Sequence, residues 1–88
     1  MSTTINIKGR NGEKLGLNCD VPAQKWYFYV WNEKSEQIES GLEITREQTI
    51  KFLDKWADLT DPYTRAVHTA VRMDIDPKLV SYSTPNLP

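Results

Sequence analysis

The sequence predicts an α+β domain: a four-stranded antiparallel meander followed by two amphipathic helices packed on one face of the sheet. Three observations carry this prediction. Apolar side chains recur at alternate positions through the first half of the chain, and the period changes to that of a helix at Thr45. The connections between strands are too short for parallel crossovers. At 88 residues we expect one domain over 1–82 and an irregular tail over 83–88.

The first two strands are expected over residues 3–10 and 13–20, where apolar and polar side chains alternate. Asn11 and Gly12 lie between them, and this pair is typical of a type I′ hairpin turn because both residues tolerate a positive φ. In the second strand, Cys19 shares the apolar face with leucines. We therefore interpret its thiol as a small core side chain rather than a nucleophile.

Residues 24–32 give the strongest strand signal, because aromatic and β-branched side chains suit a pleated surface. Both faces of this strand are apolar. One face carries Trp26, Phe28 and Val30, and the other carries Lys25, Tyr27, Tyr29 and Trp31. We expect the second set to face water, because ammonium and hydroxyl groups tolerate solvent best. A fourth strand, with one charged face, is expected over 38–44.

A helix is expected from Thr45 to about Leu59, because Thr45 and Gln48 form a capping-box pattern. Its apolar side holds Ile50, Phe52, Leu53, Trp56, Ala57 and Leu59. Trp56 lies near the middle of that side, so we expect it to be buried.

A second helix begins at Asp61 and Pro62, which are an N-cap residue and a first-turn proline. Its predicted apolar arc comprises Tyr63, Ala66, Val67, Ala70, Val71 and Met73. Asp76 and Pro77 repeat the same start signal for a short turn over 78–82.

Composition excludes several classes of protein. One cysteine cannot form an internal disulfide, and no apolar run approaches the length of a membrane span. The first residues do not resemble a secretory signal, so we expect a cytoplasmic protein without a membrane partner. One histidine and one cysteine, with no glycine-rich phosphate loop, predict no metal, no cofactor and no catalytic residues. The net charge of −1 makes nucleic acid an improbable partner.

Two groups of residues remain as candidate partner-binding sites. The first is Lys25 with Tyr27, Tyr29 and Trp31, because an apolar strand face left uncovered tends to mark an interaction surface. The competing interpretation is a face shielded by the C-terminal tail. The second group is Arg65, His68 and Arg72, which share one side of the second helix and could bind an acidic surface or phosphates. More often, such a group is a solvated face paired with nearby carboxylates.

These observations predict a non-enzymatic protein-interaction domain. It would act as an accessory subunit, or as a small regulator or inhibitor of the kind that phages and mobile elements encode. The partner is another protein, and a homodimer is a further expectation, since a symmetric copy could cover the apolar strand. The alternative is a single-stranded nucleic-acid-binding protein that stacks bases on the aromatic side chains. Basic neighbours around the aromatic face would favour nucleic acid, and neutral or acidic neighbours would favour protein.

Overall fold

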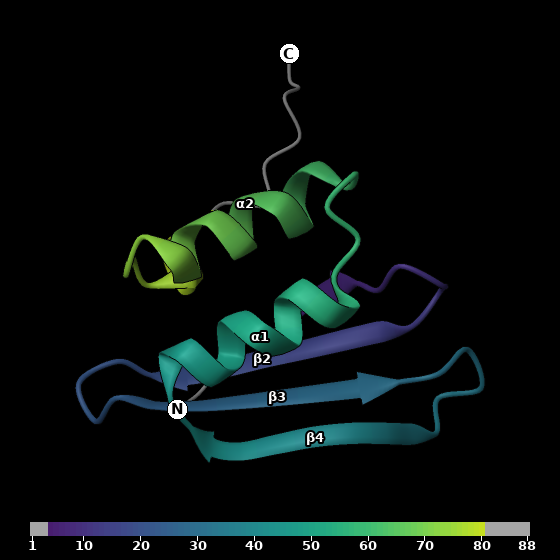
Figure 1. The fold of residues 1–88 in the computed structure, drawn as a ribbon, viewed down its shortest axis with the longest axis horizontal. Helices are drawn as coiled ribbons and strands as arrows, with labels where there is room; N and C mark the ends of the chain where they lie inside the picture. Colours follow the sequence, from purple (N-terminus) through teal and green to yellow (C-terminus); the bar gives the residue numbers. More distant parts are fainter. Residues whose placement is uncertain (1–3, 81–88) are drawn as a thin grey trace.

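The computed structural model describes residues 4–80 and confirms the α+β architecture. Four antiparallel strands form one sheet in chain order (Figure 1). Their bounds are Ile5–Lys8 for β1, Lys14–Asp20 for β2, Lys25–Trp31 for β3 and Gln37–Ile44 for β4. The helices are α1 (Arg46–Trp56), α2 (Pro62–Arg72) and a short 3-10 helix, η1 (Pro77–Leu79). The end of the predicted last turn, 81–82, and the tail 83–88 lie outside the described residues.

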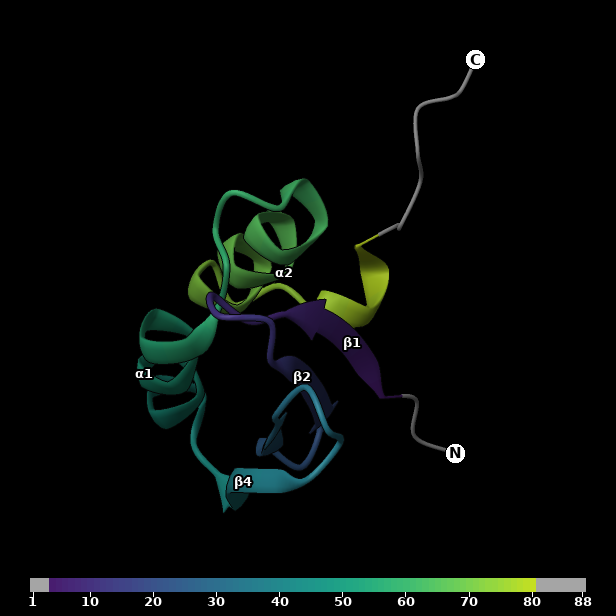
Figure 2. The ribbon, with the colours of Figure 1, turned by 90° about the vertical axis from the view of Figure 1, so that its right-hand side faces the viewer.

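The core lies between the sheet and the two long helices, which pack against the same sheet face (Figure 2). Phe28 is fully buried in β3, and its ring stacks on Phe52 of α1 with centroids 5.2 Å apart. Gly41 of β4 makes room for Phe52, because a Cβ there would lie 2.8 Å from that ring. The prediction that Phe28 and its face neighbours Trp26 and Val30 point inward is confirmed.

Helix α1 begins as predicted but ends earlier. The Thr45 side chain accepts a hydrogen bond from the Gln48 amide, and the Gln48 side chain accepts one from the Thr45 amide, so the capping box is formed. The predicted end at Leu59 is wrong, because Ala57 leaves the helix to form a β-bridge with Gly9. The burial of Trp56 is also only partial, and its indole Nε1 has no hydrogen-bond partner among the described residues.

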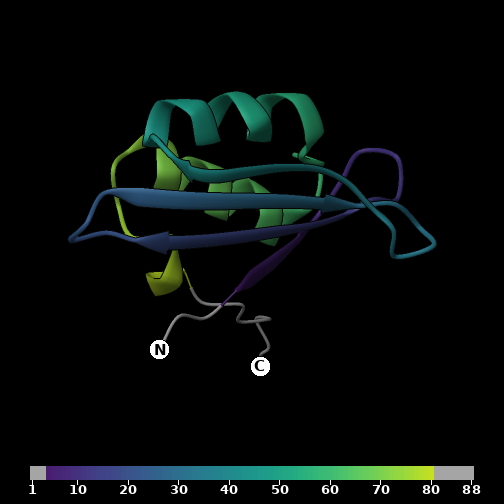
Figure 3. The same cartoon turned by 90° about the horizontal axis from the view of Figure 1, so that it is seen from below.

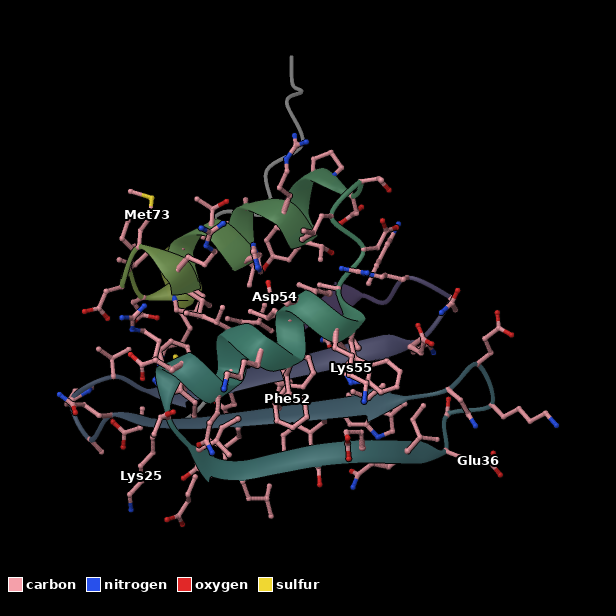
Figure 4. All side chains as sticks on the ribbon, in the orientation of Figure 1. Lys25, Glu36, Phe52, Asp54, Lys55 and Met73 are labelled. Atoms are coloured by element: carbon pink, nitrogen blue, oxygen red, sulfur yellow. The ribbon has the colours of Figure 1, made fainter. Side chains whose placement is uncertain are left out.

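The buried side of α2 differs from the predicted arc. Val67, Ala70 and Val71 are buried as expected, whereas Ala66 is exposed and Met73 is 63% exposed (Figure 4). Polar side chains take the remaining buried positions, namely Thr64 and His68. Each has a hydrogen-bonding partner on a neighbouring segment, Lys8 for Thr64 and Asp54 for His68, so their burial leaves no unpaired group.

The turn between β1 and β2 is longer than the predicted type I′ turn. Gly12 has a positive φ of 86°, but Asn11 does not. The Gly9 amide donates to the Glu13 carbonyl, and the Asn11 amide donates to the Glu13 carboxylate. The Glu13 side chain therefore supplies the acceptor that a tighter turn would take from the backbone.

Asp61 joins the start of α2 to β1. Its Oδ2 accepts from the Thr64 amide at 3.0 Å and from the Thr64 hydroxyl at 2.8 Å, and its Oδ1 lies 3.6 Å from Lys8 Nζ. The Thr64 hydroxyl in turn accepts from the Lys8 amide. The Thr64 amide, together with its hydroxyl and Lys8, holds the pKa of Asp61 below the ordinary value of 3.8.

This arrangement predicts a loss of stability in acid. A lowered folded-state pKa stabilises the fold above the ordinary value of 3.8, and that stabilisation disappears as the pH falls through the folded-state pKa. We expect the free energy of unfolding to fall below about pH 4, measured by urea titration at a series of pH values. Asp61→Asn keeps a capping oxygen but has no charge to titrate, so its acid slope should be shallower. Identical slopes would contradict this role of Asp61.

Candidate interaction face

One face of the sheet is covered by no α-helix from the part of the chain that the structure describes. Figure 3 shows α1 against one side of strands β2–β4, and on the opposite side it shows no α-helix, with the short helix η1 near one end of β2. Side chains alternate along a strand, so the neighbours in sequence of each buried strand residue point to this opposite face. We call it the open face. Its strand residues are Asn6, Lys8, Lys14, Gly16, Asn18, Tyr27, Tyr29, Trp31, Ser40 and Leu42.

The aromatic strip, defined as Tyr27, Tyr29 and Trp31, runs along the middle of the open face. All three side chains are half-buried. The rings of Tyr29 and Trp31 stack with centroids 5.7 Å apart and an angle of 20° between their planes. Trp31 also lies over Gly16 of β2, where an added Cβ would meet the indole at 2.8 Å. The ring is therefore held flat against the sheet before any partner binds.

Two further features extend this surface. On β4, Leu42 is 62% exposed and Ile38 is 48% exposed, which adds aliphatic area beside the aromatic strip. On the other side of the strip, a cleft of about 290 Å³ is bordered by Asn18, Tyr27 and Tyr29. The cleft is large enough to accept a side chain from a partner.

The charges around the aromatic strip are mixed. Next to Trp31, the register places Lys14 and then Lys8 in the same row across the strands. Beside Tyr29 the row contains neutral residues, Asn6, Gly16 and Ser40. The far end holds Asp20 opposite Lys25, whose Nζ lies 3.6 Å from the Glu43 carboxylate. The face therefore carries no continuous basic surface.

The predicted helical group lies elsewhere and is divided. Arg65 and Arg72 are exposed on α2, whereas His68 is only 5% exposed. His68 Nε2 lies 2.9 Å from Asp54 of α1, and Figure 4 shows Asp54 between the two helices. His68 thus joins α1 to α2. Because α2 packs on the opposite side of the sheet, Arg65 and Arg72 do not border the aromatic strip, and the two predicted groups form separate surfaces.

The described residues contain little that resembles a reactive site. Burial raises the pKa of the Cys19 thiol to about 11, and the sulfur lies 3.9 Å from Asp76. Such a thiol is protonated at neutral pH and a poor nucleophile. Among residues 4–80, no group of three His, Cys, Asp or Glu side chains is placed to hold a metal ion. In the same part of the chain, no helix is both long enough and apolar enough to span a membrane.

Sequence reasoning found the aromatic strip but missed the residues that shape it. In the sequence, Gly16 is only one of the polar positions of an alternating strand. Its contact with Trp31 depends on the register between β2 and β3, which the sequence does not show. Leu42 read as part of an ordinary fourth strand. The register pairs Ser40 with Tyr29 and Gly41 with Phe28, so Leu42 lies on the open side with Ser40, and the bulge that follows turns Ile44 back toward the core beside Trp26. Positive φ at Glu43 is the local sign of that bulge.

Comparison of the chain with protein-family models, with curated proteins and with solved structures finds no match.

Proposed function

We propose that this chain is a non-enzymatic protein-interaction domain that binds another protein through the open face, as an accessory subunit or as a regulator or inhibitor. The observation that carries the proposal is the stacked, half-buried pair Tyr29 and Trp31 on a sheet face without a covering helix. We retain the cytoplasm as the proposed compartment.

The chemistry of the face supports a protein ligand. Aromatic side chains dominate binding energy in protein interfaces, and their rigid rings lose little conformational entropy on binding. Stacking and the contact with Gly16 already fix the Trp31 ring, which lowers that cost further. Exposed Leu42 and Ile38 supply apolar area at the rim.

The alternative, a single-stranded nucleic-acid-binding protein, is favoured by one observation. Lys14 stands next to Trp31 at one end of the aromatic strip, and Lys8 follows in the same row with its ammonium group paired with Asp61. Stacked bases with phosphates along these lysines would use that end of the face. The acidic groups Asp20 and Glu43 at the other end oppose an extended strand of phosphates. We therefore place this function second.

The double variant Tyr29→Ala with Trp31→Ala is expected to abolish partner capture while the domain stays folded, because both rings lie outside the core. Wild type and variants would be immobilised and exposed to native cell extract treated with nuclease. Binding through buried aromatic contacts should depend weakly on salt. The matched control is Arg65→Ala with Arg72→Ala, which changes exposed side chains away from the open face and should capture as wild type does.

A third variant tests whether the position of the Trp31 ring matters, and not only its presence. Gly16→Val keeps both rings but displaces the Trp31 indole, because the new side chain occupies its position on the sheet. We expect it to lower capture as well, with thermal melting used to confirm folding. Labelled single-stranded oligonucleotides titrated at two salt concentrations test the alternative. Micromolar binding that disappears at high salt and requires Lys14 would replace the protein-binding proposal.

A further inference from the structure

The outer edge of β1 is open over part of its length. Backbone groups of alternate residues on an edge strand point away from the sheet. The Lys8 amide donates to the Thr64 hydroxyl and the Lys8 carbonyl accepts from Asp58, so Lys8 points outward. The Gly9 amide donates to Glu13 and points inward. By the same alternation the amide and carbonyl of Asn6 point outward, and they have no partner among residues 4–80.

A partial fifth strand already occupies the rest of this edge. Ala57 forms an antiparallel bridge with Gly9, the Arg10 amide donates to the Trp56 carbonyl, and the Asp58 amide donates to Lys8. The pairing stops at Lys8, because the chain then turns into α2. The position of a fifth strand is therefore filled beside residues 8–10 and open beside residues 4–6.

A cleft of about 500 Å³ runs along the open part. We call it the edge cleft, and it is lined by Thr4, Ile5, Asn6, Ile7, Lys8, Asp61, Tyr63 and Lys78. The carboxylate of Asp61 already accepts from Thr64 and pairs with Lys8. Lys78 donates to the Cys19 carbonyl and has no carboxylate within 4.0 Å among the described residues. The cleft therefore has an excess of positive charge at Lys78.

The other edge of the sheet is built differently. The register between β3 and β4 shifts twice, between Trp26 and Phe28 and again between Val30 and Trp31. Bulges of this kind interrupt the regular row of backbone groups and discourage pairing with another strand. The register of β1 with β2 has no such shift. Within residues 4–80, therefore, β1 is the sheet edge that presents regular backbone groups in a cleft.

We propose that the edge cleft binds an extended, acidic peptide segment of another protein, which adds to β1 as an antiparallel strand. One peptide residue exchanges both backbone hydrogen bonds with Asn6. Its two neighbours face the side of Ile5, Ile7 and Tyr63 and should be apolar, because side chains alternate along the added strand. An acidic side chain at the end of the segment pairs with Lys78. The edge cleft is separate from the aromatic strip, so this site does not depend on the function proposed above.

The probe for this proposal is the capped tetrapeptide acetyl-Val-Thr-Val-Glu-amide, whose four residues would lie opposite Ile7, Asn6, Ile5 and Thr4, added to isotope-labelled full-length chain and followed by NMR. We expect amide shifts at residues 4–8 and at Lys78, slower hydrogen exchange at the Asn6 amide, and no shifts at Tyr29 or Trp31. Methylating the backbone nitrogen of the peptide Thr removes one of the two hydrogen bonds to Asn6. It should weaken binding at least about tenfold, because the hydrogen bond is lost and the added methyl group also blocks close approach. The same peptide with Lys in place of Glu should bind more weakly than the acidic probe.

Lys78→Glu should weaken binding of the acidic probe, whereas Lys14→Glu, the same charge change on the open face, should leave it unaltered. Melting curves would establish that both variants fold, and the methylated probe tests pairing without any change to the protein. The proposal is wrong if the probe does not bind at millimolar concentration, if methylation has no effect, or if the shifts fall on the aromatic strip. Sedimentation that shows a species near twice 10.2 kDa, lost on Asn6→Pro substitution, would assign the edge to a second copy instead.

Discussion

Phe28→Ala is expected to lower the stability of the protein by a large fraction of its total. Phe28 is fully buried, and its ring stacks on Phe52, so truncation removes the contact that joins β3 to α1. Removing a buried Phe side chain costs about 3–5 kcal/mol. A chain of this size has a total stability of about 4–13 kcal/mol. The melting temperature, followed by circular dichroism, should fall by at least about 12 °C.

Two control substitutions test whether this loss of stability is specific to the buried side of β3. Tyr29→Ala changes a neighbouring aromatic residue of the same strand but on the open face, so it should lower the melting temperature much less. Trp56→Ala should also cost less than Phe28→Ala, because Trp56 is only partly buried. If Trp56→Ala proved the more damaging change, the assignment of Phe28 as the centre of the core would be wrong.

Thr64→Val is expected to destabilise the fold markedly, although it preserves the volume of a fully buried side chain. The Thr64 hydroxyl accepts from the Lys8 amide and donates to Asp61, so it connects α2 to the edge strand β1. Valine leaves the Lys8 amide without its acceptor and removes one donor from the Asp61 carboxylate. Leaving such a group unpaired costs about 1–3 kcal/mol, measured as the change in free energy of unfolding in urea.

Thr60→Val is the matched control for this substitution. Thr60 is exposed, and its hydroxyl donates to Asp58 at the surface, where water can replace it. Its expected effect is within about 0.5 kcal/mol. Equal effects at Thr60 and Thr64 would mean that the link between α2 and β1 contributes nothing specific.

Local patterns predicted most of the fold because the relevant interactions are local. The alternation in 24–32 places Phe28 inside and Tyr29 outside whatever the partner strands are. The capping box of Thr45 and Gln48 is complete within four residues of chain. The order of the four strands and the starts of the two long helices therefore followed from the sequence, although β1 (Ile5–Lys8) is shorter than the predicted 3–10.

The errors occur where distant segments meet. The local sequence predicts Ala57 to be helical, but Ala57 pairs instead with Gly9, which lies 48 positions earlier in the chain. The local sequence places His68 on a basic helix face, but in the structure His68 is buried against Asp54 of α1. The residues that hold Trp31 in place were missed for the same reason. The separation of the two predicted binding groups did follow from the sequence, because both helices were expected on the sheet face opposite the aromatic residues.

The two edges of the sheet differ in a way that limits how copies of this chain can associate. β4 is interrupted by two register shifts, whereas β1 is regular. When β1 of one copy pairs with β1 of another, both regular edges are used, and the enlarged sheet ends in the irregular β4 on each side. Association of copies through their sheet edges therefore stops at a dimer. The irregular β4 edge in this way disfavours open-ended β-polymerisation, even though the sheet also has an uncovered face.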